Sequence, residues 1–329
     1  MSTEATTSVP HVVLGRSGIT STRLGLGCSI WPLKLPYHQV LDTLRTALDL
    51  GIRHIDVAPI YGTEEIVGRA LHDLGIPEDL VLATKACSYL GELGILYREY
   101  SAATVYESVG RSLKRLQVDC LDIVHLHDVE PEDLPQILSE KGALRALLDL
   151  KARGVVRSVG MATQSLETLQ AAIDTNEVDH IQAYHSYTLL NQDLMQSVCP
   201  KARGKNLSIL NNAPFAGFIL ATGPVPDARY NYRLAERPVT EAARRVEEVC
   251  TRKGVSLETA ALAFSLKNPE IDVTVVGAST PEKLRRRVEA FQAPLEKEDF
   301  VEMILAAGGS FPISSPCAGK NPCKDDRGL

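Results

Sequence analysis

Residues 53–62 read RHIDVAPIYG, and this short segment presents two chemically active side chains close together. The apolar residues around Asp56 predict a buried strand that delivers this carboxylate to its carboxyl end. Pro59 then predicts a tight turn, because its ring fixes the backbone φ angle. The turn presents Tyr61 just beyond the end of the strand.

In two later segments, a predicted strand also ends near a chemically active side chain. LVLATKA at 80–86 ends near Lys85, and LDIVHLHD at 121–128 ends near His127. Their remaining residues are mostly Leu, Ile, Val and Ala, which is typical of strands in a parallel sheet that is covered on both faces. Polar side chains at such strand ends predict a functional site, which consists of Asp56, Tyr61, Lys85 and His127.

Strands and helices alternate along the chain. The helix predicted at 37–50 has apolar residues at i, i+3, i+4 and i+7 and ends at Gly51. Eight βα units in roughly 290 residues are what a closed parallel barrel requires, so we predict an α/β protein with a (β/α)8 TIM barrel. The strands are predicted at 24–30, 55–57, 80–86, 121–127, 155–162, 180–187, 206–213 and 272–278. The other helices are predicted at 63–74, 104–116, 140–153, 165–176, 191–203, 239–253, 256–267 and 281–292.

Three segments lie outside this repeat. Residues 11–27 contain two β-prone runs around a Gly-containing turn, which predicts an N-terminal β-hairpin. The insertion at 214–238 is rich in Gly, Pro, Tyr and Arg, and predicts a lid, a binding loop or disorder. Irregular tails are expected at 1–10 and 307–329. No linker interrupts the pattern, so residues 1–329 are predicted to form a single domain.

The composition narrows the class of partner. The chain has 44% hydrophobic and 23% charged residues, as ordinary globular proteins do, and a net charge of −6 that argues against nucleic acid or anionic membranes. The sequence contains no run of about 18 apolar residues, which a membrane span would require, and residues 1–10 lack the apolar core of a signal peptide. Seven scattered cysteines without a CxxC motif predict neither a metal site nor a disulfide framework, and favour a reducing compartment. We therefore expect a cytoplasmic monomer or weak homo-oligomer that acts on a small molecule.

The four predicted site residues suit proton transfer. A free tyrosine has a pKa of about 10, and a lysine ammonium beside Tyr61 would lower it by favouring the phenolate. Asp56 would hold Lys85 in place, and His127 would orient the substrate oxygen through a hydrogen bond. The set contains no nucleophile, metal or redox group, so a hydride must move to or from a cofactor.

Structural alternatives remain for each residue taken singly. A strand-end Asp or Lys often forms only an ion pair at the rim of a barrel. His125 lies two residues before His127 on the same strand face, and it is more typical of a core histidine. The same interpretation applies to His54 and His185.

The chain resembles the aldo-keto reductase superfamily over nearly its full length. The resemblance implies a (β/α)8 barrel, a nicotinamide cofactor and a proton-relay tetrad at the four residues named above. Its most specific parts are the D-x4-Y spacing from Asp56 to Tyr61 and the D-x4-H spacing from Asp122 to His127. The matching segments are HIDVAPIYGTEEIVGRAL (54–71), ATK (83–85), SLKRLQVDCLDIVHLHD (112–128), RSVGMAT (157–163) and VVGASTPEKLRRRVEAF (275–291).

Within the superfamily, LDIVHLHD and HSYTLLN (185–191) are most similar to dehydrogenases that oxidise D-arabinose or L-galactose at C1. That similarity implies an aldose of the D-arabinose, L-galactose or L-fucose type, with its anomeric hydroxyl between Tyr61 and His127 and an aldonolactone as product. Asp128, Tyr89 and Trp31 are candidate substrate contacts. Trp31 either stacks on a sugar face or packs at the barrel rim.

The resemblance also implies how a cofactor is held. Gly25-Leu26-Gly27 lacks the third glycine of a Rossmann fingerprint, and the family instead uses the loops after strands seven and eight. Thr280-Pro281 predicts the start of a helix whose amino terminus supports an anion. The family's stacking Tyr falls on Asn212, so Phe215 becomes a candidate for that role. The implied cofactor contacts are Gly27, Thr163, Gln182, Asn212, Gly277, Ser279, Lys283 and Arg287.

The positions that read the 2′-phosphate favour NAD, with NADP possible. A Lys of many relatives that use NADP falls on Gly277, and an Arg falls on Lys283. One lost charge-assisted hydrogen bond weakens phosphate recognition by about 1.5–3 kcal/mol. Arg286 and Arg287 either compensate for this loss or form a solvated helix face.

Two other functions are compatible with the same sequence. The first is a general NADPH-dependent reductase of aldehydes and ketones. The second is a regulatory subunit that keeps the barrel and the cofactor without turnover, against which the complete tetrad argues.

Overall fold

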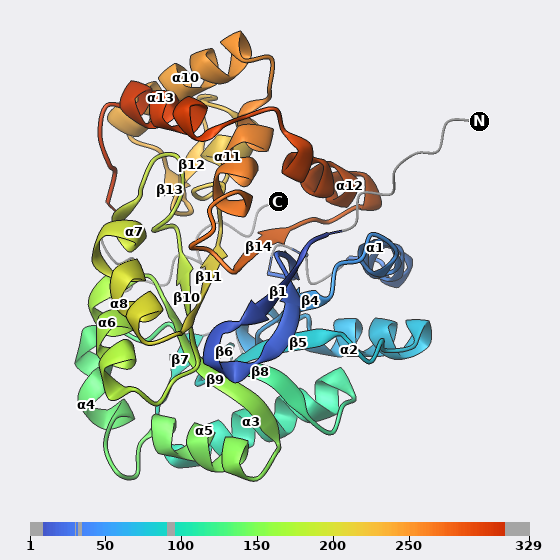
Figure 1. Cartoon of the computed structure of the whole chain (residues 1–329). Helices are drawn as coiled ribbons and strands as arrows, with labels where there is room; N and C mark the ends of the chain where they lie inside the picture. Colours follow the sequence, from blue (N-terminus) through green and yellow to red (C-terminus); the bar gives the residue numbers. More distant parts are fainter. Residues whose placement is uncertain (1–8, 30, 32–34, 91–95, 313–329) are drawn as a thin grey trace.

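The computed structural model describes residues 9–29, 31, 35–90 and 96–312. Eight parallel strands form a closed barrel in the order β10-β11-β14-β3-β4-β5-β8-β9, which confirms the predicted (β/α)8 barrel (Figure 1). These strands are β3 (Leu24–Gly27), β4 (His54–Asp56), β5 (Val81–Ala86), β8 (Leu121–His127), β9 (Val156–Thr163), β10 (His180–Tyr184), β11 (Ser208–Asn212) and β14 (Val273–Gly277).

Helices surround this ring of strands, as Figure 1 shows. The predicted helix at 191–203 is divided in two, α7 (Asp193–Ser197) and α8 (Cys199–Gly204). The division falls at Val198, just before a proline that occupies the first turn of α8 and cannot donate a helical hydrogen bond. The other helices that follow barrel strands are α1 (Tyr37–Asp49), α2 (Glu64–Leu74), α3 (Ala102–Leu116), α5 (Ala143–Ala152), α6 (Leu166–Thr175), α11 (Leu257–Leu266) and α12 (Pro281–Glu289).

The predicted hairpin closes one end of the barrel. Strands β1 (His11–Leu14) and β2 (Ile19–Thr22) are joined by the 3-10 turn η1 (Gly15–Ser17), and the hairpin lies across the ring of strands in Figure 1. Leu14 and Ile19 are buried in one cluster with inward-facing residues of the barrel strands, among them Ile123 and Val275. Because this floor is sealed with apolar side chains, the site must lie at the opposite, carboxyl end of the strands.

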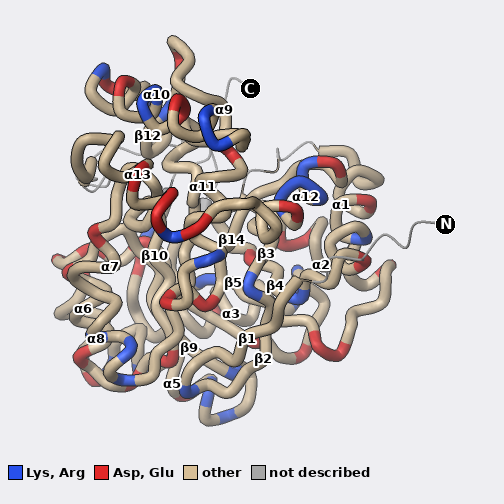
Figure 2. Tube along the Cα trace, turned by 45° about the horizontal axis from the view of Figure 1, so that its top comes forward, with Lys and Arg blue, Asp and Glu red and all other residues tan. Residues whose placement is uncertain are grey.

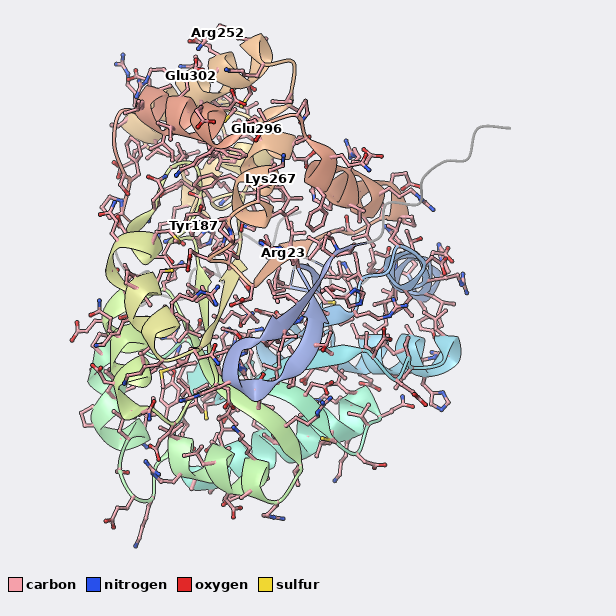
Figure 3. The ribbon with its side chains drawn as sticks, in the orientation of Figure 1. Arg23, Tyr187, Arg252, Lys267, Glu296 and Glu302 are labelled. Atoms are coloured by element: carbon pink, nitrogen blue, oxygen red, sulfur yellow. The ribbon has the colours of Figure 1, made fainter. Side chains whose placement is uncertain are left out.

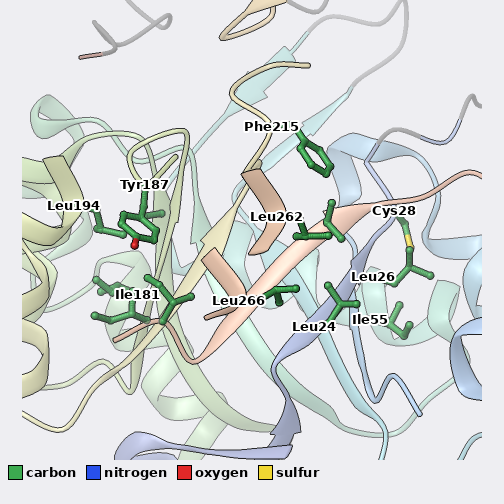
Figure 4. Packing of buried hydrophobic residues seen from close by; sticks show 14 of the residues in the cluster. Leu24, Leu26, Cys28, Ile55, Ile181, Tyr187, Leu194, Phe215, Leu262 and Leu266 are labelled. Atoms are coloured by element: carbon green, nitrogen blue, oxygen red, sulfur yellow. The ribbon is translucent and has the colours of Figure 1, made fainter. Parts of the chain in front are cut away.

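The main core lies between the strands and the helices. Leu24 and Leu26 of β3 are fully buried and lie near Leu262 and Leu266 of α11, as Figure 4 shows. Burying one such side chain contributes about 1.5–3 kcal/mol to stability. This packing fixes the directions in which the strand ends point.

The chain adds elements that the sequence pattern did not predict. Helix α13 (Lys297–Ala307) packs against α10 (Arg237–Arg252), where Arg252 pairs with Glu302 at 2.7 Å (Figure 3). Phe300, Met303, Ile304 and Ala307 keep the i, i+3, i+4, i+7 spacing of a helix, but the exposed apolar residues Val301 and Leu305 blur this pattern. Other short additions are β6 (Ser88–Leu90), β7 (Leu96–Arg98), η4 (Pro131–Asp133) and α4 (Leu134–Ile137), while the last three residues of the helix predicted at 281–292 form the 3-10 turn η5 (Ala290–Gln292).

The predicted loop at 214–238 contains regular structure. It includes α9 (Ile219–Thr222) and a two-stranded ladder of β12 (Arg229–Tyr230) and β13 (Arg233–Leu234), and α10 already begins at Arg237. Residue 307 ends a helix, so only residues 308–312 of the predicted C-terminal tail are described as irregular. Residues 1–8 and 313–329, with Cys317 and Cys323, lie outside the described residues.

Acidic and basic residues are spread over the molecule, with a basic run on α12 (Figure 2). Within the part of the chain that the structure describes, no helix is long and apolar enough to cross a membrane.

Candidate active site

The four predicted site residues meet at the carboxyl end of three neighbouring strands. Asp56 ends β4, Lys85 lies in β5 and His127 ends β8. Tyr61 ends the 3-10 turn η2 (Pro59–Tyr61), which starts with the proline expected at this turn. The strand order β4-β5-β8 therefore brings together side chains from three separate segments.

Lys85 and Asp56 form a buried ion pair. The Lys85 ammonium donates to Asp56 Oδ1 at 2.7 Å and to the Val57 carbonyl at 3.0 Å, and both side chains are only 2% exposed. Gln182 Nε2 donates to the second carboxylate oxygen, Asp56 Oδ2, at 2.8 Å. Because both oxygens of Asp56 are engaged, Lys85 is held in one position.

Tyr61 lies between Lys85 and His127. Its ring centroid is 5.0 Å from Lys85 Nζ, and its ring meets the His127 ring edge-on at 5.9 Å. Burial raises the pKa of Tyr61 well above its ordinary value, and the nearby carboxylates of Asp56 and Asp128 raise it further. The expectation that Lys85 biases Tyr61 toward phenolate is therefore wrong for this arrangement. The cation is already paired with Asp56, and its attraction does not outweigh the cost of burying a phenolate. Tyr61 rests as a neutral phenol.

His127 rests as a neutral imidazole. Burial lowers its pKa to about 4, although the neighbouring Asp128 carboxylate opposes this effect. Its Nε2 lies 3.7 Å from Asp128 Oδ1, and its Nδ1 is buried and has no hydrogen-bond partner within the described part of the chain. A neutral imidazole keeps one N–H donor, which suits the orientation of a substrate oxygen.

Two tyrosines that sequence reasoning missed hold this part of the site. Tyr100 donates to the carbonyl oxygens of His127 and Asp128, at 2.8 and 2.9 Å. Tyr184 donates to Asp128 Oδ1 at 2.9 Å. Tyr184 follows Gln182 by two residues on β10, so strand alternation could have placed it at the mouth. Tyr100 lies in a loop and gave no comparable signal.

Asp128 lies at the mouth, as a substrate contact requires. Its backbone adopts a left-handed conformation with φ of 53°, and the Arg98 guanidinium lies 3.9 Å from Oδ2. Burial works to raise the pKa of Asp128, but His127, Arg98 and the Tyr184 hydrogen bond outweigh it and hold the pKa below its ordinary value. Asp128 is therefore an ionised hydrogen-bond acceptor.

The other two candidate substrate residues are placed differently. Trp31 is 3% exposed and donates through Nε1 to the Ala278 carbonyl at 2.7 Å, so it packs at the barrel rim. Tyr89 stacks on Tyr97, with ring centroids 5.6 Å apart, and its strand β6 packs against the η2 turn that carries Tyr61. Tyr89 is therefore half-buried near the mouth, whereas Trp31 is fully buried.

Gln182 and Asn212 are paired beside the tetrad. Gln182 Nε2 donates to Asn212 Oδ1 at 3.0 Å, while Gln182 Oε1 is buried and has no partner among the residues that the structure describes. An unpaired buried acceptor fits the amide N–H of a nicotinamide ring. The Thr163 hydroxyl, by contrast, donates to the Val129 carbonyl and accepts from Ser165 N–H, so its one proton is already used within the chain.

Glycines and a helix terminus lie where the cofactor is expected. Gly27 pairs with Gly277 across β3 and β14, and a Cβ atom at Gly27 would lie 3.1 Å from Val275. Thr280 caps α12 by accepting from the backbone N–H of Lys283, as predicted. Lys283 Nζ also donates to Ser279 Oγ at 3.3 Å. The amino terminus of α12 thus offers N–H groups and a cation to an anion.

Arg287 is not on a solvated helix face. It is 6% exposed, pairs with Glu258 of α11, and its guanidinium lies 4.5 Å from the centre of the Phe215 ring. Glu258 was not identified from the sequence, because no spacing rule joins α11 to α12. Phe215 is therefore in contact with Arg287 and is 8% exposed.

The remaining barrel histidines form an inner layer below the mouth. His125 and His180 meet edge-on at 4.7 Å, and His54 Nδ1 lies 3.0 Å from Ser21 Oγ of the floor hairpin. All three are at most 1% exposed, as expected of core histidines. Within the described ranges, no group of three or more His, Cys, Asp or Glu is arranged to hold a metal ion.

Comparisons with known proteins identify the family to which the chain belongs. The model of the Aldo/keto reductase family matches residues 23–304. The chain is 31% identical to L-galactose dehydrogenase of Arabidopsis thaliana over 297 residues, which cover 86% of this chain and 88% of the relative. It is 29% identical to D-threo-aldose 1-dehydrogenase of Pseudomonas sp over 75% of this chain and 81% of the relative. It is equally similar, at 29%, to the NADH-specific methylglyoxal reductase of Escherichia coli over 88% and 95%.

A solved structure has the same architecture. An aldo-keto reductase from Bacillus halodurans, in its holo form, superposes with a TM-score of 0.78 at 25% identity. The match covers 92% of this chain and 98% of the other.

Proposed function

The chain belongs to the aldo/keto reductase family, and we propose that it oxidises an aldose at C1 to the aldonolactone, with NAD as hydride acceptor. Members of this family are oxidoreductases that use nicotinamide cofactors. The observation that carries the proposal is the buried Lys85–Asp56 pair, which lies 5.0 Å from the Tyr61 ring beside His127. The choice of an aldose is supported by the similarity to L-galactose and D-threo-aldose dehydrogenases.

Tyr61 and His127 share the work at the substrate oxygen. The anomeric hydroxyl of the cyclic sugar is proposed to lie between the two rings. His127 orients it through a hydrogen bond. Tyr61 first releases its own proton to solvent, and the resulting phenolate accepts the hydroxyl proton as C1 loses a hydride. Lys85 stabilises this phenolate before it takes the proton, and Asp56 with Gln182 keeps the ammonium in place.

A nicotinamide cofactor, when bound, supplies the hydride acceptor and a positive charge that favours the phenolate. Gln182 Oε1 is proposed to receive its carboxamide. Ser279, Lys283 and the amino terminus of α12 are proposed to hold the phosphates. Gly27 and Gly277, which pair at the ends of β3 and β14, are proposed to let the cofactor approach the backbone closely.

NAD is favoured over NADP by the charges near the adenosine end. Gly277 offers no cation, and Lys283 offers a single point charge. The Arg287 guanidinium is already paired with Glu258 and packed on Phe215. A 2′-phosphate would therefore have to compete with a carboxylate for this arginine.

The test is a matrix of initial rates. Formation of reduced nicotinamide is followed with D-arabinose, L-galactose, L-fucose, D-glucose and D-xylose, each with NAD and with NADP, and Tyr61→Phe is the control. Rapid oxidation of one or two sugars with NAD, lost in the control, supports the proposal. Absence of oxidation with every sugar overturns it.

The neutral phenol of Tyr61 supports a second candidate, the reduction of small aldehydes and ketones. A protonated tyrosine donates directly to a carbonyl oxygen, and a methylglyoxal reductase is among the relatives. Reduction of methylglyoxal with NADPH or NADH, without sugar oxidation, would identify this activity. Tight cofactor binding without turnover in either direction would instead identify a regulatory subunit.

A further inference from the structure

His185 lies at the barrel mouth, directly after the last residue of β10. Its backbone is left-handed, with φ of 63°, and its N–H donates to the Asn212 carbonyl at 3.3 Å. A non-glycine residue in this conformation costs about 1–3 kcal/mol and persists only where the surroundings fix it. The ring of His185 is therefore held in place by the barrel framework rather than by a flexible loop.

The imidazole of His185 has no internal partner. It is 0% exposed, and neither Nδ1 nor Nε2 forms a hydrogen bond within the described residues. Burial lowers its pKa to about 3, so the ring is neutral and carries one donor and one acceptor. Leaving both unpaired is unfavourable, and nothing in the packing of the ring compensates for it.

Aromatic rings cover this imidazole. Tyr232 meets it edge-on at 4.9 Å, and Phe218 meets Tyr232 at 6.1 Å. These two residues belong to the insertion between β11 and α10, and their side chains are 40% and 39% exposed. Partly exposed side chains change rotamer rapidly, so the cover can move while His185 stays fixed.

His185 also lies close to the chemistry. Its ring is 5.7 Å from that of Tyr184, whose hydroxyl donates to Asp128 Oδ1. Tyr232 is one of the groups whose electrostatic influence raises the pKa of Tyr61, which indicates that the cover lies near the proton-transfer group. The side chains of His127, Asp128, Tyr184 and His185 thus form one polar wall of the mouth.

We propose that His185 is a substrate-binding residue that hydrogen-bonds an aldose hydroxyl beyond C1 once Tyr232 has moved aside. The inference rests on the proposed function, because it requires a polyhydroxyl substrate with C1 between Tyr61 and His127. Asp128 accepts from a second hydroxyl, and the displaced rings of Tyr232 and Phe218 border the sugar. A short carbonyl compound such as methylglyoxal does not reach this wall.

His185→Phe separates this role from a structural one. Because the imidazole has no partner, an apolar ring of similar shape should keep or raise the thermal midpoint. The variant should raise KM for the preferred sugar about tenfold while kcat changes less than about twofold, since the hydrogen bond acts in binding. NAD affinity, measured by quenching of protein fluorescence, should stay unchanged. His185→Asn, which keeps a donor and an acceptor, should restore part of the lost affinity.

Deoxy sugars then identify the hydroxyl. The sugar that lacks the contacted hydroxyl should bind the unmodified protein and His185→Phe equally well, whereas other deoxy sugars should keep the tenfold difference. Sugar oxidation with an unchanged KM in His185→Phe, or a lower thermal midpoint with equal losses for sugar and NAD, would overturn the role of His185 alone. No sugar oxidation by the unmodified protein would overturn the proposed function and this inference together.

Discussion

The mouth of the barrel and the inner layer just below it differ in charge, although both are buried. At the mouth, Lys85 is paired with Asp56 at 2.7 Å and His127 lies beside Asp128. In the inner layer, both nitrogens of His125 lack a partner, and its nearest ring neighbour is the neutral His180. Burial alone therefore produces inert neutral rings. Chemistry requires burial together with a paired charge.

Removal of the mouth cation should have the largest effect. Lys85→Met leaves the Asp56 carboxylate buried without its ion-pair partner, which should cost about 3–5 kcal/mol of stability. Loss of the group that stabilises the Tyr61 phenolate should also lower kcat about 10²–10⁴-fold. Urea unfolding and initial rates measure the two effects. A stable variant with normal kcat would mean that the pair is only a rim ion pair.

The second largest effect is expected from acidification, which should destabilise the fold through the histidines of the inner layer. His54 and His180 have their pKa lowered from 6.5 to about 4 by burial. Between those values the unfolded chain binds more protons than the folded chain, so stability falls as the pH falls from about 6.5 to 4. Each of these histidines should contribute a loss of about 3 kcal/mol across that window. Urea unfolding at several pH values tests this, and His180→Phe should make the dependence shallower.

The pH dependence of catalysis should instead reflect the protonation of Tyr61 and His127 at the mouth. Because the pKa of Tyr61 is raised, sugar oxidation should increase with pH from neutral into the alkaline range, by up to about tenfold per pH unit. His127 should add no acid limb near pH 6.5, because its pKa is lowered to about 4. A profile of kcat against pH checks both statements. A limb at pH 6.5 that disappears in His127→Gln would show that His127 titrates in the working range.

The smallest effect is expected at Arg287, which is buried on the cofactor side of the site. Glu258→Gln removes the carboxylate that pairs with Arg287 and leaves the guanidinium available to a 2′-phosphate. The ratio of kcat/KM for NADP over NAD should rise about threefold to tenfold. Glu241→Gln, which breaks an exposed ion pair with Arg237, is the matched control. An unchanged ratio would show that Arg287 does not reach the cofactor.

The sequence was sufficient for the features that depend on local pattern. Strand spacing predicted the barrel, and the strand-end positions of Asp56, Lys85 and His127 predicted that they meet. The cap at Thr280 also followed from residue types alone. These features need no knowledge of side-chain distances.

Features that depend on competing energies were not predicted. The pKa of Tyr61 depends on how burial competes with the Lys85 cation, which Asp56 already neutralises. The sequence gives neither the distance from Tyr61 to Lys85 nor the distance from Lys85 to Asp56. The pairing of Arg287 with Glu258 joins two helices whose relative placement is set by packing. His185 was interpreted as a core histidine because its burial, but not its lack of partners, follows from the strand pattern.

The hairpin at the floor of the barrel imposes an order on biosynthesis. Leu14 and Ile19 leave the ribosome early, yet they pack against Val273 and Val275 of the last barrel strand. Contacts between such distant segments form late, because the intervening chain must first be arranged. Any nascent chain that stops before β14 therefore leaves the apolar hairpin incompletely covered, which a chaperone or a protease can recognise. This hairpin precedes every barrel strand in the chain and is among the last elements to be fully buried, so its burial marks a closed barrel.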